Sequence, residues 1–208
     1  MSKKDTKSKI KDVALKLFNR DGFANVRLQH ISDVCGLSLG NIGYHYRTKN
    51  DILYALFSDF MEEQKLLLAE FRVLPLFEDF NRFLISNFEL QQRYVFFYKD
   101  ALDLTRLYEN ISKQYKEHLK WQELQLQGML VFNEARRALD SNGNKFFTDK
   151  MASLLVWASE SWISRQAVIG AEEFDRSSYL EMVWFLLKPY FTPIGEEEFE
   201  NRVIIEAQ

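Results

Sequence analysis

Apolar residues recur along most of this chain with the spacing expected of helices that bury one face. In residues 6–20, Ile10, Val13, Ala14, Leu17 and Phe18 fall at i, i+3, i+4, i+7 and i+8, which is one continuous stripe. Similar spacing predicts helices over residues 25–35, 38–46, 48–71, 111–139, 148–169 and 176–191, with further helical spacing in 75–110. Only 8 glycines and 3 prolines interrupt the 208 residues. We therefore predict an all-α fold of about nine helices.

Residues 25–46 read as two short helices joined by a tight turn. Ile31 and Val34 give the first helix an apolar side. Gly36 can adopt the left-handed conformation that ends a helix. Ser38 can cap the next helix with its hydroxyl. The spacing predicts a helix-turn-helix, with the second helix over residues 38–46.

This second helix is polar but almost uncharged, and it carries Asn41, Tyr44 and His45. Such a helix suits a surface that lies close against a partner, as a recognition helix does in the DNA major groove. Tyr44 has a second interpretation, which is core packing against the helix over residues 6–20.

Charge is divided unevenly along the chain. The net charge is −3, yet residues 1–50 contain ten Lys and Arg against four Asp, a net of +6, and the remainder carries −9. A basic N-terminal part on an acidic body is the pattern expected when only that part meets phosphate. The alternative is a basic tail without a partner.

The next helix is expected to begin at Thr48, with Asp51 as an acidic residue in its first turn. At about 24 residues it spans roughly 36 Å, long enough to belong to two parts of the protein. Pro75 marks the following break. Aromatic residues crowd 75–110, and they fit either a packed core or the lining of a hydrophobic cavity.

Several short motifs resemble the tetracycline-repressor (TetR/AcrR) family of bacterial transcription regulators. They are Ala14–Phe18, Gly22-Phe23, the turn from Ile31 to Ser38, Gly40–Ile42, Tyr44–Lys49 and the run ending at Leu53. The resemblance covers about the first 55 residues. It implies a three-helix DNA-binding domain at residues 1–50 and a helical effector-binding and dimerisation domain at residues 51–208. It also implies a homodimer formed through the two C-terminal helices.

Two positions depart from the family pattern. Where the family usually has Ser or Thr capping the second helix, this chain has Val26 and Arg27. Either Asn25 caps that helix, or Arg27 contacts a phosphate directly. Gly43 replaces the usual aromatic residue; it weakens the helix by about 1 kcal/mol relative to Ala and permits close approach of the backbone to DNA.

Candidate DNA contacts follow from these motifs. For phosphates they are Arg27, Tyr44, His45, Lys49 and the N-terminal lysines, and for base edges they are Gln29, Ser38, Leu39, Gly40 and Asn41. Lys49 has the alternative of an ordinary exposed lysine.

The segment from Leu180 to Leu187 is nearly apolar on all sides, so it must be buried on several sides, and a second copy of the chain can supply that burial. The candidate interface residues are Leu154, Trp157, Ser161, Trp162, Leu180, Val183, Trp184 and Leu187. The acidic tail after Pro193 ends in Val203–Ile205, which either docks on the body or stays loose.

Candidate pocket residues for a small hydrophobic or amphipathic effector are Phe60, Phe83, Phe96, Tyr98, Arg106, Trp121 and Trp157. Arg106 either holds an anionic ligand head or pairs with Asp103 or Glu109. In residues 111–139, Trp121, Leu124 and Met129 are expected to face inward. His118 lies in a charged run and is expected on the surface.

No catalytic constellation is recognisable. Three His and one Cys are scattered without metal-ligand spacing, and no glycine-rich phosphate loop is present. Cys35 is expected to be a small core residue, with a redox sensor as the alternative. We expect no enzyme activity, no cofactor and no metal. The single cysteine and the absence of a long apolar run favour a soluble cytoplasmic protein without a membrane partner.

The sequence thus predicts a dimeric regulator that binds double-stranded DNA at a palindromic operator. We expect a repressor that a small, largely hydrophobic ligand releases, with the helix over residues 48–71 as the connection. Two alternatives stay open: an all-helical dimeric interaction module without an effector, and an activator.

Overall fold

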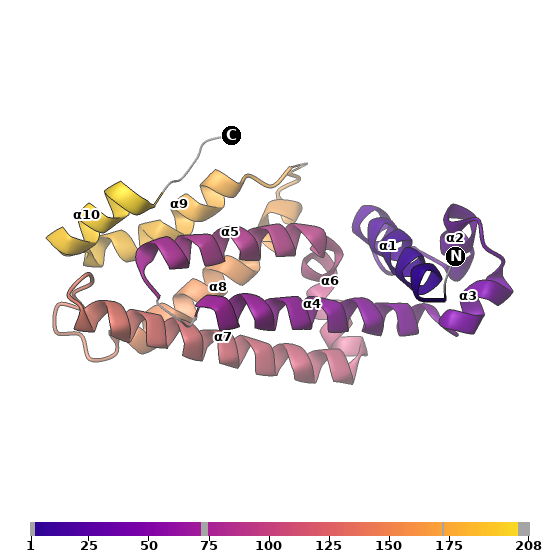
Figure 1. The fold of residues 1–208 in the computed structure, drawn as a ribbon, viewed down its shortest axis with the longest axis horizontal. Helices are drawn as coiled ribbons and strands as arrows, with labels where there is room; N and C mark the ends of the chain where they lie inside the picture. Colours follow the sequence, from indigo (N-terminus) through magenta and orange to yellow (C-terminus); the bar gives the residue numbers. More distant parts are fainter. Residues whose placement is uncertain (1–2, 72–74, 172, 204–208) are drawn as a thin grey trace. The chain divides into compact units, whose positions relative to one another are not determined.

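The computed structural model describes residues 3–71, 75–171 and 173–203, without the side chains of Lys3, Lys4 and Phe71. Within these ranges the chain is all-α, with ten α-helices, one short 3₁₀ helix and no strand (Figure 1). The helices are α1 Lys3–Asp21, α2 Leu28–Cys35, α3 Leu39–His45, α4 Lys49–Phe71, α5 Phe77–Arg93, α6 Val95–Leu107, α7 Glu109–Ala135, α8 Phe147–Val168, α9 Arg176–Leu187, η1 Lys188–Tyr190 and α10 Pro193–Arg202. The all-α prediction is confirmed.

The chain forms two compact units. The first unit contains residues up to Glu62 and Tyr94–Gln114, and the second unit contains Glu63–Arg93 and the residues from Tyr115 onward. The helices α4 and α7 each contribute to both. The first unit therefore extends beyond residue 50, and the functional boundary at that residue stays a prediction.

The first unit is built around the apolar stripe of α1. Ile10, Ala14, Leu17 and Phe18 are all buried. The Phe18 ring contacts that of Phe96 on α6, with 5.5 Å between centroids. Two polar contacts strengthen this packing: Asn19 accepts a hydrogen bond from the Phe96 backbone N–H (3.1 Å), and Asp100 accepts one from that of Phe23 (3.1 Å). Residues distant in sequence thus support the end of α1.

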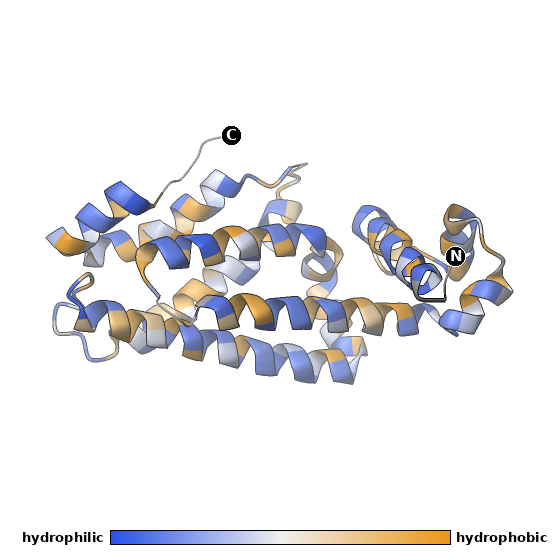
Figure 2. Cartoon of the chain, viewed as in Figure 1, coloured by the Kyte–Doolittle hydropathy of each residue, from blue (hydrophilic) through white to orange (hydrophobic). Residues whose placement is uncertain are grey.

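The core of the second unit centres on α9. Trp184 is fully buried; its ring contacts those of Phe77, Phe80 and Phe199, and its Nε1–H donates to Asn81 (2.9 Å). Figure 2 shows hydrophobic (orange) and hydrophilic (blue) residues alternating along the helices.

Four residues expected at the dimer interface are buried within the single chain. These are Leu180, Val183, Trp184 and Leu187, each at most 1% exposed. The prediction that they meet a second copy is therefore wrong, because neighbouring helices of the same unit, including α5 and α8, already cover them.

The helix α10 was not predicted, although its start carries a common signal. Thr192 caps it by accepting from the Gly195 N–H, and Pro193 occupies the first turn. Val203 is buried after the helix, while the expected Ile204 and Ile205 lie outside the described residues.

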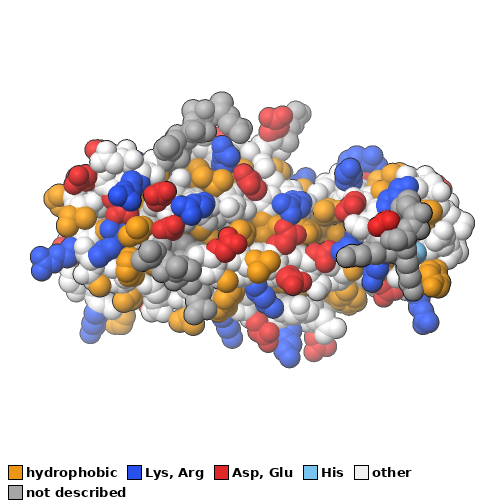
Figure 3. Space-filling view, viewed as in Figure 1, with side chains coloured by type: hydrophobic (Ala, Val, Ile, Leu, Met, Phe, Trp, Pro, Cys, Tyr) orange, Lys and Arg blue, Asp and Glu red, His pale blue; other side chains and the backbone are white. Residues whose placement is uncertain are grey.

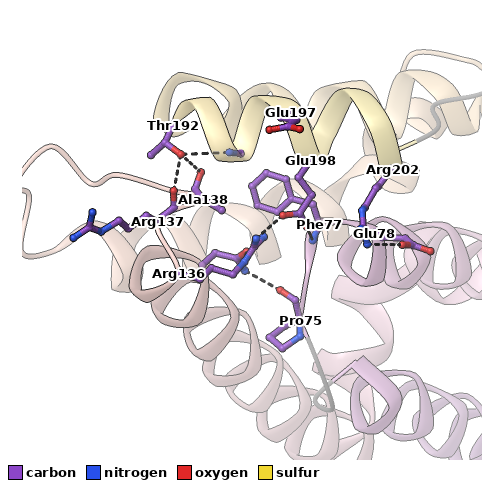
Figure 4. Close-up of polar contacts among 12 residues, drawn as sticks. Pro75, Phe77, Glu78, Arg136, Arg137, Ala138, Thr192, Glu197, Glu198 and Arg202 are labelled. Atoms are coloured by element: carbon purple, nitrogen blue, oxygen red, sulfur yellow. Dashed lines mark hydrogen bonds and ion pairs between the residues drawn. The ribbon is translucent and has the colours of Figure 1, made fainter.

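A charged contact fixes α10 to the rest of the second unit (Figure 4). One carboxylate oxygen of Glu198 pairs with Arg136 at 2.5 Å, and the other accepts from the Phe77 N–H at 2.8 Å. Asn133, in the last turn of α7, donates to the Pro75 carbonyl (2.8 Å). A single glutamate therefore joins α10, α5 and the end of α7.

Helical spacing assigned several side chains to the wrong environment. Val34 and Leu124 are each 60% exposed, whereas His118 is only 4% exposed. Burial, with a further contribution from Lys65, lowers the pKa of His118 to about 4. Met129 and Cys35 are buried as expected, and burial raises the pKa of the Cys35 thiol.

None of the described helices combines the length and hydropathy needed to cross a membrane.

We predict that Gly195→Ala destabilises the protein. A Cβ at this position would lie 2.2 Å from the Ala138 carbonyl oxygen, so α10 would have to shift. We expect the free energy of unfolding to fall by about 1–3 kcal/mol, measured by chemical denaturation.

Gly128→Ala is the matched control. Its added Cβ meets nothing within 4 Å inside α7, so it should leave stability unchanged or raise it by up to about 1 kcal/mol. Equal effects of the two substitutions would contradict the packing of α10.

Candidate DNA interface

The turn between α2 and α3 has the predicted geometry. Gly36 ends α2 in the left-handed region, with φ 63° and ψ 34°. The Leu37 N–H donates to the Ser32 carbonyl at 3.1 Å. The Ser38 hydroxyl caps α3 by accepting from the Asn41 N–H at 3.2 Å. These local hydrogen bonds fix the direction in which α3 leaves the turn.

The start of α2 resolves one of the sequence alternatives. Arg27 is the N-cap residue, and its backbone N–H donates to Nδ1 of His30 at 3.3 Å. Asn25 does not cap the helix, because its amide donates to the Asp21 carbonyl instead (2.8 Å). The Arg27 side chain is exposed, which leaves its phosphate contact as a prediction.

The outer face of α3 is exposed and almost uncharged. Leu39 is 47% exposed and Tyr44 is 69% exposed, while Gly40 and Asn41 are also on the surface. Ile42 is fully buried and anchors the inner face. The alternative in which Tyr44 packs in the core is therefore wrong.

The remaining candidate positions near this helix differ in their surroundings. Gln29 is exposed, but its amide donates to Asp33 at 2.6 Å. His45 is partly buried, and its ring lies 5.2 Å from that of Tyr44. At Gly43 an added Cβ would meet nothing within 4 Å, so space inside the protein does not require glycine there.

A reciprocal cap positions the start of α4. The Thr48 N–H donates to Asp51 (2.8 Å), and the Asp51 N–H donates to the Thr48 hydroxyl (3.2 Å). This is a capping box with aspartate in the acidic position. It confirms the helix start expected at Thr48 and leaves three residues, Tyr46–Thr48, between α3 and α4.

Lys49 is turned toward the protein. Its ammonium group donates to the Phe23 carbonyl at 2.7 Å and to the Ala24 carbonyl at 3.4 Å, and it lies 4.1 Å from the Phe23 ring centroid. Burial lowers the pKa of Lys49. Lys49 is therefore not an ordinary exposed lysine, since it holds the loop between α1 and α2.

The N-terminal lysines also have partners within the first unit. Lys9 donates to the Cys35 carbonyl (2.9 Å), Lys7 lies 5.4 Å from the Tyr46 ring centroid, and Lys11 pairs with Asp59. Burial, followed by the charge of Asp59, raises the pKa of Tyr46 to about 12. Figure 3 shows blue Lys and Arg side chains on this unit. These contacts anchor α1 beside the turn.

Arg47 is a further candidate contact beyond those expected from the sequence. It lies between α3 and α4 and its side chain is exposed. A basic residue directly after the recognition helix was the available sequence signal. Arg47 therefore presents a positive charge at the surface beside α3, whereas the charge of Lys49 is directed toward backbone carbonyls.

The candidate effector residues are divided between the two units. In the first unit Phe60, Phe96 and Tyr98 are buried, and the Phe60 and Tyr98 rings are 5.8 Å apart. Arg106 is exposed there, and the described residues include no ion pair between it and Asp103 or Glu109.

In the second unit Phe83 is buried, Trp121 is partly buried and Trp157 is 70% exposed. Trp157 shares an exposed side of α8 with Leu154, which is 41% exposed, while Ser161 and Trp162 are partly buried. On α9, Phe185 is 71% exposed, in contrast to the four buried interface candidates.

We predict that Lys49→Met lowers the melting temperature, because two backbone carbonyls lose their donor. The expected loss of stability is about 1–2 kcal/mol, measured by calorimetry. Arg47→Met, which removes an exposed charge two residues away, should leave the melting temperature unchanged. An equal loss in both variants would contradict the inward role of Lys49.

Two family models match this chain. The model described as "Bacterial regulatory proteins, tetR family" matches residues 10–56, which include the turn. The model described as "Bacterial transcriptional repressor" matches residues 57–199.

Curated relatives include an HTH-type transcriptional regulator of Staphylococcus aureus strain USA300, which is 24% identical over 89 residues. That match covers 43% of this chain, and the chain spans 43% of the length of this relative.

Solved structures share the fold over more of the chain. A TetR-family transcriptional regulator from Marinobacter aquaeolei VT8 superposes with a TM-score of 0.86 at 22% identity, covering 100% of both chains. A putative regulator from Saccharomonospora viridis, in complex with choline, has a TM-score of 0.69 at 16% identity and covers 96% of this chain and 97% of its own.

The matched models span both the helix-turn-helix and most of the remaining chain, and the fold agrees with them. The chain therefore belongs to the TetR family of DNA-binding transcriptional regulators.

Proposed function

We propose that this protein is a dimeric repressor that binds a palindromic operator and that a small ligand releases from it. The observation that carries the proposal is the exposed, uncharged outer face of α3, formed by Leu39, Gly40, Asn41 and Tyr44. A face without charge can approach base edges closely, while neighbouring cations bind the phosphates.

The proposed contacts divide by chemistry. Asn41 is suited to adenine, because a carboxamide can form two hydrogen bonds with that base edge. Gln29, Ser38, Leu39 and Gly40 are the other proposed base contacts. For phosphates we propose Arg27, Tyr44 and His45, to which the exposed Arg47 is added. Of the N-terminal lysines expected there, Lys7, Lys9 and Lys11 have partners inside the first unit and are not proposed as contacts. The inward position of Lys49 makes its role one of support.

A second copy would supply the two-fold symmetry that a palindrome requires. The exposed Leu154, Trp157 and Phe185 support a revised interface on α8 and α9, together with Ser161 and Trp162. Large apolar side chains at this level of exposure are the usual central contacts of a protein interface.

Release by a ligand would act through α4. This helix begins in the first unit beside the recognition helix and continues into the second unit. A ligand that prefers one arrangement of α4 would change the affinity of the dimer for its operator, and DNA would change the affinity for the ligand equally. A largely hydrophobic effector, with the aromatic candidates as its contacts, remains the sequence prediction.

The principal alternatives are an activator and a dimeric interaction module without an effector. Reporter expression from the protein's own promoter, with and without the protein, separates repressor from activator. Equal affinity for random DNA and for that promoter would favour the interaction module.

We predict that Tyr44→Ala weakens binding to the protein's own promoter DNA by at least about tenfold, which corresponds to roughly 1.4 kcal/mol. Fluorescence anisotropy would measure the dissociation constant. Because Tyr44 is 69% exposed, the melting temperature should stay the same.

Leu102→Ala is the control, since Leu102 is 87% exposed on α6 of the same unit. It should preserve both DNA affinity and stability. Undiminished binding by both Tyr44→Ala and Asn41→Ala would reject α3 as the recognition helix.

We predict that Trp157→Glu converts the dimer to a monomer. A charge placed in the centre of an apolar interface should cost about 2–4 kcal/mol of association energy, detected by sedimentation equilibrium. Leu124→Glu, at an exposed apolar position on α7, should leave the mass unchanged. A dimer that persists in Trp157→Glu would exclude this face.

A further inference from the structure

The second unit buries an unusual group of polar side chains. Gln64, Asn87, Gln91 and Gln122 are fully buried, and His118 is 4% exposed. They come from α4, α5 and α7. Such side chains are normally at the surface of a protein unless partners satisfy them. We call these five residues the buried polar cluster.

Hydrogen bonds join the cluster to α8. The Gln64 amide donates to Asn87 at 2.9 Å, and the Gln91 amide donates to the Ser159 carbonyl at 3.2 Å. On the α7 side, Gln122 follows His118 by one helical turn. The cluster therefore lies among several helices of a single unit.

Aromatic residues accompany these polar groups. The Tyr115 ring stacks on His118 with 6.3 Å between centroids, and the Tyr115 hydroxyl donates to Glu160 at 2.7 Å. Tyr179 is fully buried, and its pKa is raised by burial, with Asn87, Ser159 and Glu160 in its surroundings. Phe88 stacks on Tyr179 at 5.1 Å.

Many atoms of the cluster have no hydrogen-bonding partner. They are Gln64 Oε1, Gln91 Oε1, both ring nitrogens of His118 and both amide atoms of Gln122. Each unsatisfied buried group costs about 1–3 kcal/mol. Proteins leave few such groups, so their accumulation at one place requires an explanation. Apolar residues of similar size would give a more stable core.

The unpartnered buried atoms include both hydrogen-bond donors and acceptors, and none of the five side chains carries a charge. The pKa of His118, lowered to about 4, keeps its imidazole neutral at pH 7, with one donor and one acceptor. The nearby carboxylate of Glu160 already accepts from Tyr115. Lys65, the cation that acts on His118, is exposed to solvent, so a charged ligand would lose its hydration without gaining a buried counter-ion.

We propose that the buried polar cluster binds an uncharged small molecule that carries both hydrogen-bond donors and acceptors, such as a carboxamide, on an apolar frame. This inference rests on the proposed function, because it names the chemical class of the effector. The polar cluster binds the head of the molecule, and the aromatic rings of Phe88 and Tyr179 pack against the frame. Of the hydrophobic and amphipathic effectors expected from the sequence, the structure favours the amphipathic class.

The test compares three probes that share one alkyl chain and differ in the head: octanamide, octanoate and octylammonium. Thermal melting and calorimetric titration of the full-length protein measure binding. Octanamide at about a hundred times its dissociation constant should raise the melting temperature by roughly 5–10 °C. Octanoate and octylammonium should bind at least about tenfold more weakly, since their charged heads must be desolvated.

Gln122→Leu separates a binding role from a structural one. This variant should lose the response to octanamide while its melting temperature without ligand stays the same or rises, because two unsatisfied polar atoms are removed. His118→Leu should give the same pair of results. Gln125→Leu, at a partly buried position on the same helix, is the control and should keep the full response.

Several outcomes would overturn the proposal. They are no response to octanamide, a stronger response to either charged probe, and a normal response in Gln122→Leu. A lower melting temperature or failure to fold in both Gln122→Leu and His118→Leu would show that the cluster serves a structural network instead.

Promoter binding in the presence of octanamide distinguishes the proposed binding site from the proposed release of DNA by a ligand. Octanamide that binds at the cluster without changing DNA affinity would support the site and reject ligand-controlled release. DNA binding that is intact in a protein unresponsive to octanamide would reject the site and leave the DNA-binding function in place.

Discussion

The capping hydrogen bonds at the two ends of the recognition segment are the constraint on which the DNA-binding unit depends. Ser38 starts α3, and the reciprocal pair of Thr48 and Asp51 starts α4. A helix of seven residues has little stability of its own, so its ends and its single buried anchor, Ile42, must define it. With both starts fixed, the outer face of α3 can consist of side chains chosen for a partner rather than for folding.

The second unit obeys a different constraint, which is the burial of α9. The apolar side of α9 that carries Leu180, Val183, Trp184 and Leu187 must be covered, and α5 and α8 with the aromatic residues around Trp184 provide this within one chain, while Phe185 stays exposed. The same packing brings α5, α7 and α8 close enough to enclose polar side chains. Those side chains lower the stability that the apolar core supplies, and a binding function accounts for keeping them.

Local signals in the sequence predicted the turn, the caps and most helices, because each depends on residues three or four positions apart. The residues from distant helices that pack against a given helix face were not predictable in this way. Helical spacing shows which residues share a face, but it does not show what lies against that face, so Val34 and Leu124 were placed inside and Leu180 at an interface. His118 was misplaced because its charged neighbours in sequence lie on other faces of α7, whereas Gln122 lies on its own. For the site, the exposed face of α3 followed from the motif. That Arg47 is exposed while Lys49 points inward did not, because Lys49 binds backbone carbonyls of the loop after α1.

The contacts of the lysines have a consequence for the physical chemistry of DNA binding. Lys11 forms an ion pair with Asp59, and Lys9 and Lys49 donate to backbone carbonyls. Lys7 lies against the Tyr46 ring. These ammonium groups are fixed by the protein rather than free to follow a phosphate backbone. The number of counterions that DNA releases on binding is then smaller than the +6 net charge of residues 1–50 indicates. A regulator with this arrangement would depend less on ionic strength and more on the fit of α3 to its site.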